Sequence, residues 1–457
     1  MTQPVDHTVT PPDDPDTPSG TAGAADHPLL SELAWRGMLY QHTDGLGEHL
    51  ARGTVTGYCG FDPTASSLHV GNLVPVMGLV HLQRHGHRPL VLVGGGTGLI
   101  GDPSGKTAAR TLNSRETVAE NAAGIRRQLE RFVDFTGANA ALIHDNAEWL
   151  CELGAIDFMR DVGKHFTVNY MLAKESVRSR IEAGISYTEF SYMLLQAYDF
   201  LEMNNRMGVS LQVGGSDQWG NMTAGMELIR RSSGGEAHVL TFPLITKADG
   251  TKFGKTESGT VWLDPERTSP YRFYQFWYNT DDRDIGKFLR FFSLRARADI
   301  NALDEATAAH PEERQAQRAL AAEMTERVHG TDALRAAEEV STLLFGGGDP
   351  RSLSDGALAA LAAEVPFVEV AADPALADPA AASGAPAVAD AMALLVDAGL
   401  VASRGAAKRL AEQGGMYVNG ARRGAAERFV REEELLRGRH VLLRKGAREY
   451  ALVRLTD

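Results

Sequence analysis

The sequence is poor in several features, and each absence excludes a class of protein. Only two cysteines occur in 457 residues, Cys59 and Cys151. They have no spacing typical of a disulfide framework or a cysteine zinc site, so we expect both to be free thiols. No apolar run approaches the roughly 20 residues that span a bilayer, and no charged-then-apolar leader opens the chain. We therefore expect no membrane partner and a cytoplasmic location.

Positive charge is absent from residues 1–28, which contain six prolines and five acidic residues. Such a segment buries too little apolar surface to offset the entropy of ordering, so a disordered acidic tail is predicted. The whole chain carries a net charge of −13, yet residues 386–457 hold 13 Lys and Arg against 9 Asp and Glu. That segment is therefore +4 and the rest −17, which fits either a solvated surface or an RNA contact.

The length favours two or three packed units. Residues 29–262 alternate short apolar runs with helical patterns, and the runs at 88–95 and 208–215 are each followed by a glycine-rich turn and a helical stretch. This is typical of a parallel sheet in an α/β domain, whose ligands lie at the carboxyl ends of the strands. Residues 263–345 are predicted to be helical. Residues 346–386 are predicted to be a linker, interrupted by the apolar stretch VPFVEV, before a small domain at 387–457.

The stretch GFDPTASSLHVGN follows a predicted strand, which Asp62 and the next proline end. Apolar residues then recur with helical spacing, so a helix is predicted to begin near Gly71. His69 and Asn72 would flank the N-terminus of that helix, where free backbone N–H groups favour an anion. The ordinary alternative is that Asn72 only caps the helix and His69 lies on the surface.

The next turn, VGGGTGLIGDPSGK, contains a GxGxxG pattern after a strand. In a dinucleotide-binding fold the third glycine lies inside a helix, whereas here Asp102 and a proline follow it, so we reject that interpretation. The stretch is then a glycine-rich loop at the carboxyl end of a strand, and it supplies one carboxylate, Asp102, and one lysine, Lys106. A carboxylate at the end of a strand suits an ammonium group or a ribose hydroxyl.

A helix is predicted over residues 187–203, with Tyr192, Gln196 and Asp199 on one side and apolar residues on the other. A polar stripe of this kind is usually the solvent face. This one holds Tyr and Gln in place of Lys and Glu, which favours a site for a small polar molecule.

Two more turns complete the candidate set. QVGGSDQWGN places Asp217 after a strand and a glycine pair, a position suited to ribose hydroxyls. TKADGTKFGKTESG holds Lys247, Lys252 and Lys255 in a loop that is either an ordinary surface loop or one that closes over a polyphosphate. The sequence HLQRHGH has no accompanying carboxylate, so no metal site is predicted.

Taken in order, these stretches resemble the bacterial tyrosyl-tRNA synthetases, a family of class I enzymes. YCGFDPTASSLHVGNL resembles the HIGH-type signature of the family and KFGKT its KMSKS-type loop. The resemblance covers nearly everything from Leu30 to Asp457. It implies a Rossmann-like catalytic domain at 29–262, an α-helical anticodon-arm-binding domain at 263–345 and a small α+β RNA-binding domain at 387–457. It also implies a tyrosine–tRNA ligase.

The resemblance assigns roles to matching residues, which we take as expectations. The ATP phosphates would meet His69, Thr64, Lys106, Lys252 and Lys255. The remaining ATP contacts would come from Cys59, Asp62, Gly71, Asn72, Gly215 and Asp217. L-Tyrosine would be held by Tyr58 and Asp199 at its hydroxyl, Asp102, Tyr192 and Gln196 at its ammonium, and Gln218 at its carboxyl. Because buried polar groups are costly when unpaired, the Tyr58 and Asp199 pair would discriminate against phenylalanine.

The implied reaction needs no protein nucleophile. The tyrosine carboxylate attacks the α-phosphate of ATP, pyrophosphate leaves, and the tyrosyl group then passes to the terminal adenosine of tRNA(Tyr); positioning and electrostatics supply the rate. Mg²⁺ is expected to arrive with ATP, and no tightly bound cofactor is expected. Asn72 departs from the common pattern, which has a second histidine there. Its amide still donates a hydrogen bond, but it does not titrate.

The C-terminal stretch ASRGAAKRLAEQGGMYVNG reads as a short helix that places Arg404 and Lys408 four residues apart, then a strand and an Asn-Gly turn. It resembles a small RNA-binding domain first known from a ribosomal protein, so both cations are expected to contact tRNA. The family also implies a homodimer.

Three alternatives remain at this point. A tryptophanyl-type synthetase shares the fold, and the Tyr58 and Asp199 pair argues against it. An RNA-binding or splicing factor would have no use for both signature motifs. An adenylyltransferase that makes a small cofactor would not carry the helical and RNA-binding domains.

Overall fold

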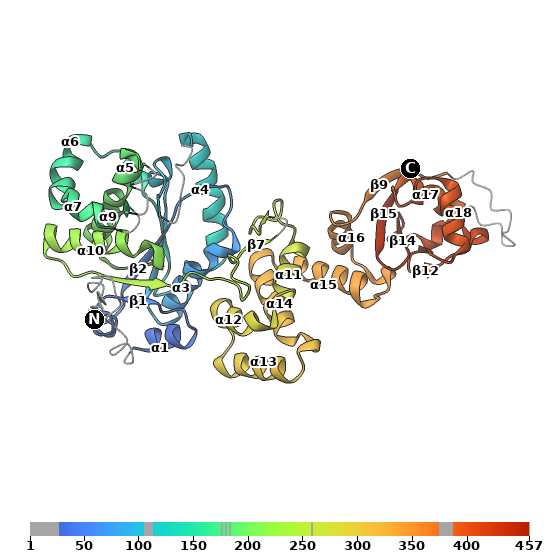
Figure 1. The fold of residues 1–457 in the computed structure, drawn as a ribbon, viewed down its shortest axis with the longest axis horizontal. Helices are drawn as coiled ribbons and strands as arrows, with labels where there is room; N and C mark the ends of the chain where they lie inside the picture. The colour runs from blue at the N-terminus through green and yellow to red at the C-terminus, as the bar shows by residue number, and fades with distance from the viewer. Residues whose placement is uncertain are drawn as a thin grey trace, which may run out of the picture. The chain divides into compact units, whose positions relative to one another are not determined.

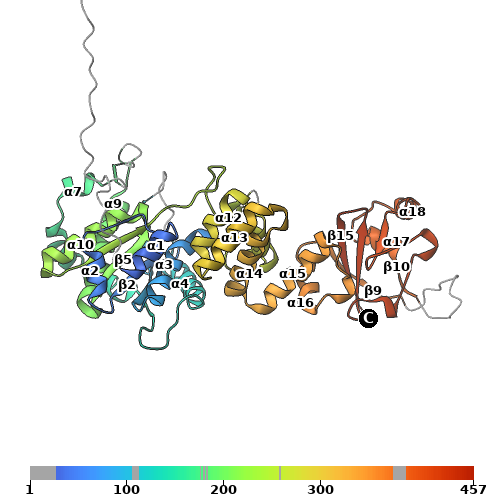
Figure 2. The same ribbon diagram turned by 90° about the horizontal axis from the view of Figure 1, so that it is seen from below.

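The fold is taken from a computed structural model and is drawn in Figures 1 and 2. The described residues are 27–104, 113–174, 177–178, 181, 184–256, 259–373 and 387–456. The predicted acidic tail lies outside them, except for His27 and Pro28. These two begin a helix, because the His27 ring accepts a hydrogen bond from the Leu29 N–H and proline is favoured in the first turn.

The chain divides into two compact units, residues 1–260 with 286–294, and residues 261–285 with 295–457. The first unit is built on a six-stranded sheet in the order β1-β6-β5-β2-β3-β4, in which only β1 is antiparallel to its neighbour. Its strands are β1 (Gln41–His42), β2 (Thr56–Phe61), β3 (Arg88–Val93), β4 (Leu142–Asp145), β5 (Val209–Gly215) and β6 (His238–Phe242). The parallel sheet predicted from sequence is confirmed.

The order of the strands reverses between β2 and β5. The chain runs from β2 outward to β3 and β4, then returns to place β5 on the other side of β2 and β6 beyond it. Loops that leave two adjacent strands in opposite directions open a crevice at the carboxyl edge, where open α/β sheets bind ligands. The loops after β2 and β5 carry the predicted histidine and aspartate motifs, so the topology brings those motifs to one place.

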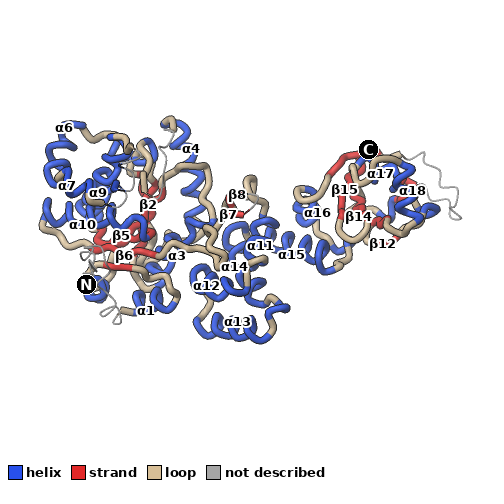
Figure 3. Tube along the Cα trace, viewed as in Figure 1, coloured by secondary structure: helices blue, strands red, loops and turns tan. Residues whose placement is uncertain are grey.

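Helices cover both faces of this sheet (Figure 3). Adjacent residues of a strand point to opposite faces, and a Cβ at Gly57 would lie 2.9 Å from Leu82 of α3, while the neighbouring Tyr58 ring packs edge-on against Phe200 of α9. Helices α3 and α9 therefore lie on opposite faces. The helices of this unit are α1 (Pro28–Trp35), α2 (Leu46–Ala51), α3 (Leu73–Arg84), α4 (Arg115–Leu129), α5 (Ala147–Leu150), α6 (Ala155–Asp157), α7 (Val168–Leu172), α9 (Tyr187–Met207) and α10 (Trp219–Ser233).

Helix α9 begins at the predicted residue 187 and is capped at both ends. Ser186 accepts from the Glu189 N–H and Glu189 accepts from the Ser186 N–H, a reciprocal cap, and Gly208 ends the helix with φ 66°. The helix continues four residues beyond the predicted end at 203. Tyr192 and Asp199 are both buried, so their side of the helix is not a solvent face.

The second unit contains the predicted helical segment and a C-terminal sheet. Its helices are α11 (Pro270–Tyr278), α13 (Arg297–Ala309), α14 (Gln315–His329), α15 (Thr331–Gly346), α16 (Asp355–Ala362), α17 (Ala391–Asp397) and α18 (Arg404–Glu412); α12 (Asp282–Phe292) spans the boundary between the units. The strands are β9 (Phe367–Ala371), β10 (Ala387–Asp390), β11 (Met416–Val418), β12 (Ala421–Arg422), β13 (Phe429–Arg431), β14 (His440–Lys445) and β15 (Glu449–Thr456).

The segment 346–386, which we expected to be a linker, is partly regular structure. Helix α16 lies within it, and β9 pairs in parallel with β15 at the edge of the five-stranded sheet β12-β11-β14-β15-β9. Strand β9 comes from the apolar stretch VPFVEV, whose edge position leaves alternate side chains exposed. Composition pointed to a linker because the flanking residues are small and polar. Residues 374–386 lie outside the described part of the chain.

The predicted Asn-Gly turn is present in the C-terminal sheet. Asn419 and Gly420 have φ of 47° and 83°, the left-handed values that a two-residue hairpin between β11 and β12 requires. The Asn419 amide also donates to the Glu434 carbonyl over 2.7 Å, which fixes the turn. Among the described residues, no helix is both long and apolar enough to cross a membrane.

A substitution at Gly78 tests the packing of α3 on β6. A Cβ there would lie 2.0 Å from the Phe242 ring, which is buried. Gly78→Ala should therefore lower the free energy of unfolding by about 1–3 kcal/mol, although alanine normally stabilises a helix relative to glycine. Gly47→Ala in α2 is the control, because its Cβ makes an ordinary 3.6 Å contact. Urea unfolding gives the free energy of unfolding of both variants. Equal values for Gly78→Ala and Gly47→Ala would contradict this packing.

Candidate active site

The candidate site is built at the carboxyl edge of the sheet by the loops after β2, β3 and β5 together with α9. Asp199 on α9 is buried in this site, with 2% of its surface exposed. The Asn146 amide donates to Asp199 Oδ2 over 2.9 Å and the Trp149 indole donates to Oδ1 over 2.7 Å. Burial raises the Asp199 pKa to about 8, against the effect of these two donors. The carboxyl group is therefore held in one orientation inside a largely apolar surround.

Tyr58 lies on β2, beside this carboxyl group. Its side chain is 1% exposed, and its hydroxyl has no hydrogen-bond partner in the described part of the chain. Burial, and next the Asp199 carboxylate, raise the Tyr58 pKa well above its usual value. An unpaired buried hydroxyl costs free energy, so the arrangement fits a ligand that brings a hydroxyl group to Tyr58 and Asp199.

A second polar group joins the loops after β3 and β5. The Gln218 amide donates to Asp102 Oδ2 over 2.7 Å, and the Asn221 amide contacts Gln196 Oε1 at 3.1 Å and Gln218 Oε1 at 3.3 Å. The structure thus brings three predicted residues, Asp102, Gln196 and Gln218, into one network. Asn221 is buried at its centre and was not predicted as a site residue.

Tyr192 makes a different contact from the one expected of an ammonium ligand. Its hydroxyl donates to Asp62 Oδ2 over 2.9 Å, and Thr97 donates to the other oxygen of Asp62 over 2.7 Å. Burial, followed by the carboxylates of Asp62 and Asp102, raises the Tyr192 pKa well above its usual value. Both carboxylate oxygens of Asp62, which we expected to contact ATP, therefore accept hydrogen bonds from protein hydroxyls.

His69 and Asn72 form a reciprocal cap at the start of η2 (Val70–Asn72), the turn that leads into α3. The Gly71 N–H donates to His69 Nδ1 over 3.1 Å, and the His69 N–H donates to Asn72 Oδ1 over 3.0 Å. Because Nδ1 accepts, the neutral ring carries its proton on Nε2. Asn72 therefore does serve as a cap, while its contact with the His69 backbone sets the position of the histidine.

The KFGKT loop packs on this turn. Gly254 has φ 80°, and a Cβ there would lie 2.8 Å from Val70 and 3.4 Å from the Gly71 nitrogen. Phe253 stacks on Phe292 at 5.2 Å between ring centroids, which secures the base of the loop. The two signature motifs, 183 residues apart in the chain at His69 and Lys252, are thus neighbours.

Two lysines of this loop, Lys252 and Lys255, are exposed, and Lys247 is half-buried. Lys255 donates to Thr260 Oγ1 over 2.5 Å within the hairpin of β7 (Lys255–Thr256) and β8 (Gly259–Thr260), and Lys247 donates to the Lys255 carbonyl over 3.1 Å. Lys252 pairs through its backbone with Thr246. Lys106, the fourth predicted cation, lies outside the described residues.

Backbone N–H groups of the glycine-rich turn after β3 donate hydrogen bonds to side chains at and just after the end of β4. The Gly95 N–H donates to Asp145 Oδ1 over 3.0 Å and the Gly96 N–H to Asn146 Oδ1 over 2.7 Å. The segment continues as a short 3₁₀ turn, η3 (Thr97–Leu99), and α4 begins only at Arg115. This agrees with our rejection of a dinucleotide-binding fingerprint. Asn146 links this turn to Asp199, a role that sequence reasoning missed.

The other predicted contacts lie around the same edge. Cys59 is buried on β2, and burial raises its thiol pKa to about 12. Thr64 is exposed in the loop after β2. Gly215 ends β5, where a Cβ would come within 2.5 Å of Asp217 Oδ1. Burial, and next the Asp102 carboxylate, raise the Asp217 pKa.

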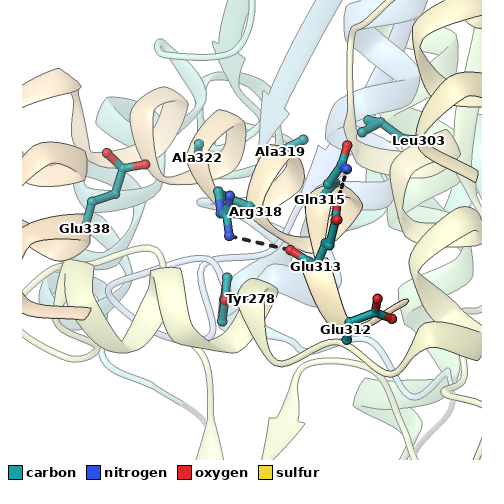
Figure 4. A pocket seen from close by; sticks show the side chains of 9 residues that line it. All are labelled: Tyr278, Leu303, Glu312, Glu313, Gln315, Arg318, Ala319, Ala322 and Glu338. Carbon is teal, nitrogen blue, oxygen red and sulfur yellow. Dashed lines mark hydrogen bonds between the residues drawn. The ribbon is translucent and has the colours of Figure 1, made fainter. Parts of the chain in front are cut away.

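The predicted RNA contacts lie in the other unit, where Arg404 and Lys408 are exposed on α18 and Lys408 is 3.9 Å from Glu412. A separate cavity of about 720 Å³ lies in the helical part of that unit. Figure 4 shows Glu312, Glu313 and Glu338 around it, with Arg318 between Glu338 and Glu313 and donating to the Glu313 carbonyl. This negative lining does not suit a phosphate backbone.

Comparison with known proteins identifies the class. A family model described as tRNA synthetases class I (W and Y) matches residues 51–346, and one described as Tyrosine--tRNA ligase SYY-like C-terminal domain matches residues 380–453. The chain therefore belongs to the class I tRNA synthetases of the tryptophan and tyrosine group. Within that class its relatives place it among the tyrosine–tRNA ligases, and it is an aminoacyl-tRNA synthetase.

Two curated relatives show how much is shared. The Tyrosine--tRNA ligase of Roseiflexus castenholzii is 54% identical over 430 residues, which are 93% of this chain and 99% of that one. That of Bacillus caldotenax is 52% identical over 431 residues, with the same coverage. A solved structure of a C-terminally truncated mitochondrial tyrosyl-tRNA synthetase from Aspergillus nidulans matches with a TM-score of 0.64 and 28% identity, over 69% of this chain and 94% of that one.

The raised Asp199 pKa gives a testable pH dependence. Between its ordinary pKa of 3.8 and about 8, the unfolded chain loses this proton while the folded chain keeps it, so stability falls as pH rises through that window. The largest slope is about 1.4 kcal/mol per pH unit. Asp199→Asn should remove this slope, whatever it does to absolute stability. Denaturant unfolding measures the free energy of unfolding of both proteins between pH 5 and 8. An equal fall of that free energy in the parent and in the variant would contradict the assignment.

Proposed function

We propose that the chain activates L-tyrosine with ATP to form tyrosyl-adenylate and pyrophosphate, then transfers the tyrosyl group to the 3′-terminal adenosine of tRNA(Tyr). Family membership supplies the class of reaction. The observation that favours tyrosine is the buried pair formed by Tyr58, whose hydroxyl lacks a partner, and Asp199, which Asn146 and Trp149 orient. A phenolic hydroxyl would donate to an oxygen of the Asp199 carboxyl group and accept from Tyr58, satisfying both groups.

The other end of the amino acid would meet the network around Asn221. In this proposal Asp102, Tyr192 and Gln196 receive the ammonium group and Gln218 the carboxylate. The contact between Gln218 and Asp102 supports this placement. The ammonium and carboxylate groups of an amino acid are bonded to the same carbon, so they need a hydrogen-bond acceptor such as Asp102 beside a donor such as the Gln218 amide. The Tyr192 hydroxyl, which donates to Asp62, keeps its lone pairs for the ammonium.

ATP would lie along the turn at His69 and the KFGKT loop. Positive charge is needed where pyrophosphate leaves, so His69, Thr64, Lys106, Lys252 and Lys255 are the proposed contacts. The Nε2–H tautomer of His69 supplies a donor, and the packing of Gly254 on Val70 brings the lysine loop to the same turn. Catalysis in this proposal is electrostatic and positional, with no covalent intermediate on the protein.

The nucleoside would lie at the rim, against Cys59, Gly71, Asn72, Gly215 and Asp217, with Asp62 beneath. Close approach at Gly71 and Gly215 supports this, since a side chain at either position would collide with its neighbours. We propose that Mg²⁺ comes bound to the ATP phosphates and neutralises their charge. The tRNA contacts proposed are Arg404 and Lys408 in the C-terminal domain, at 387–457, with the helical domain at 263–345 near the anticodon arm. We place the enzyme in the cytoplasm, as the resemblance implies.

Amino-acid-dependent exchange of pyrophosphate into ATP tests this function directly. Tyrosine should support exchange, whereas tryptophan and phenylalanine at the same concentration should give little. Exchange with tryptophan in place of tyrosine would favour the tryptophanyl alternative. No exchange with any of the three would leave an RNA-binding protein with a synthetase fold.

Tyr58→Phe tests which residue recognises the hydroxyl. The variant should lower kcat/KM for tyrosine about tenfold, because one hydrogen bond to the substrate is lost, and should leave KM for ATP unchanged. Tyr198→Phe on α9 is the matched control, since its hydroxyl pairs with Glu202 and its ring packs against Phe158. Equal loss in both variants would show that Tyr58 acts through packing alone.

We also propose a homodimer. Large apolar side chains are exposed between residues 156 and 187, a stretch that includes α7 and the start of α9. They are Ile156, Met159, Val168, Leu172 and Tyr187. A patch of this kind on one segment is typical of a protein interface, and a second copy of the chain is the partner that the family implies.

Sedimentation velocity tests the dimer. The parent protein should sediment at twice the chain mass, and Ile156→Glu combined with Val168→Glu should give monomers, because two charges would be buried without partners. Phe345→Glu, at an equally exposed apolar residue of α15, should remain dimeric. A parent protein that is monomeric at micromolar concentration would end the proposal.

A further inference from the structure

Three potential metal ligands gather at the edge of the sheet away from the candidate active site. They are His49 on α2, Glu236 in the turn before β6, and His238, the first residue of β6; one ligand atom of each lies within 4.8 Å of the other two. The active-site loops leave the carboxyl ends of β2, β3 and β5, whereas His238 begins its strand. The cluster therefore plays no part in the chemistry proposed above.

The distances within the cluster are close to those of a bound ion. Glu236 Oε1 lies 3.3 Å from His238 Nε2, and Glu236 Oε2 lies 3.9 Å from His49 Nδ1. Ligand atoms at about 2.0–2.1 Å from a tetrahedral zinc ion are about 3.4 Å apart. Small side-chain rotations would therefore bring all three atoms onto one ion.

The outer nitrogen of each imidazole already has a partner. His49 Nε2 lies 2.7 Å from Ser210 Oγ, and His238 Nδ1 lies 3.2 Å from Thr43 Oγ1. The inner nitrogen of His49, Nδ1, is buried and has no hydrogen-bond partner in the described chain. Metal-binding histidines typically show this arrangement, with the second nitrogen bonded to an oxygen that fixes the ring and the first left with a lone pair.

Charge at the cluster also favours a cation. Glu236 brings an acidic group to the cluster, and its pKa is lowered, first by its hydrogen bond from Arg52. Burial lowers the pKa of both His49 and His238. Arg52 Nη1 lies 2.7 Å from Glu236 Oε2 and would compete with a metal, but both side chains are more than half exposed.

We propose that His49, Glu236 and His238 form a binding site for a divalent transition metal of the zinc class. Two imidazoles and one carboxylate suit Zn²⁺, Ni²⁺ or Cu²⁺ better than Mg²⁺ or Ca²⁺, which prefer oxygen ligands. Three protein ligands leave a fourth position for water. The ion would tie α2 to the start of β6 and so stabilise this edge of the sheet, because it binds only the folded arrangement.

Calorimetric titration of Zn²⁺ into the metal-free full chain tests the proposal. The parent protein should bind one ion that His49→Gln and Glu236→Gln weaken at least tenfold, and Zn²⁺ should raise the melting temperature of the parent more than that of either variant. Co²⁺ should show the intense visible absorption of a tetrahedral site. Glu148→Gln is the matched control, because His144 and Glu148 form a two-membered His–Glu pair at 3.4 Å; its Zn²⁺ affinity should equal that of the parent.

Arg52→Gln separates the metal site from a simple ion pair. Removing the competing cation should preserve or tighten Zn²⁺ binding. Loss of binding in this variant would overturn the proposal, and so would parent-like binding in His49→Gln. Tyrosine-dependent exchange is unaffected by either outcome, so the test is independent of the proposed enzyme activity.

Discussion

The buried carboxyl group of Asp199 is the constraint on which the amino-acid end of the site depends. A carboxylate in an apolar surround is costly unless N–H donors hold it, and here Asn146 and Trp149 donate to its two oxygens. Asn146 in turn accepts from the Gly96 N–H. The glycine-rich turn, β4 and α9 are therefore fixed to one another through a single acid. The position of Tyr58 beside that acid then follows from its place on the neighbouring strand β2.

The sheet topology explains how the two ends of the site meet. The reversal between β2 and β5 places the turn at His69 beside the turn at Asp217, and Gly254 seats the lysine loop on the first of these. The amino-acid end and the nucleotide end thus lie at the same carboxyl edge of the sheet. Adenylate formation requires this closeness, because a carboxylate at one end must reach a phosphate at the other.

Local patterns in the sequence were enough to predict much of this architecture. Strands β2, β3 and β5 come from short apolar runs that end in glycine or Asp-Pro, and α9 comes from helical spacing with a serine cap. The family and its ligase activity, inferred from motif order, are confirmed by the relatives. The individual roles of His69, Asp102, Asp217 and the lysines remain predictions.

Other features could not be predicted because they depend on long-range packing. Asn146 and Trp149 belong to no predicted motif, and Asn221 ends the stretch QVGGSDQWGN but was given no role. The importance of all three arises only when β4 and α10 bring them to α9. Strand β9 looked like part of a linker, because the residues on either side of its short apolar stretch are small and polar. Asn72 shows a further limit of prediction from sequence. The sequence analysis treated a helix cap and a ligand contact as alternatives for this residue, but a residue that caps the turn can also contact a ligand.

In the proposed function, the pocket between Tyr58 and Asp199 receives a phenolic hydroxyl. A crystal structure of the full chain with bound L-tyrosine would show whether it does. We expect the phenolic oxygen to lie within about 3.2 Å of both the Asp199 carboxyl group and the Tyr58 hydroxyl, with the ammonium group at Asp102. Tyrosine bound with its ring elsewhere, or with Tyr58 still unpaired, would contradict it.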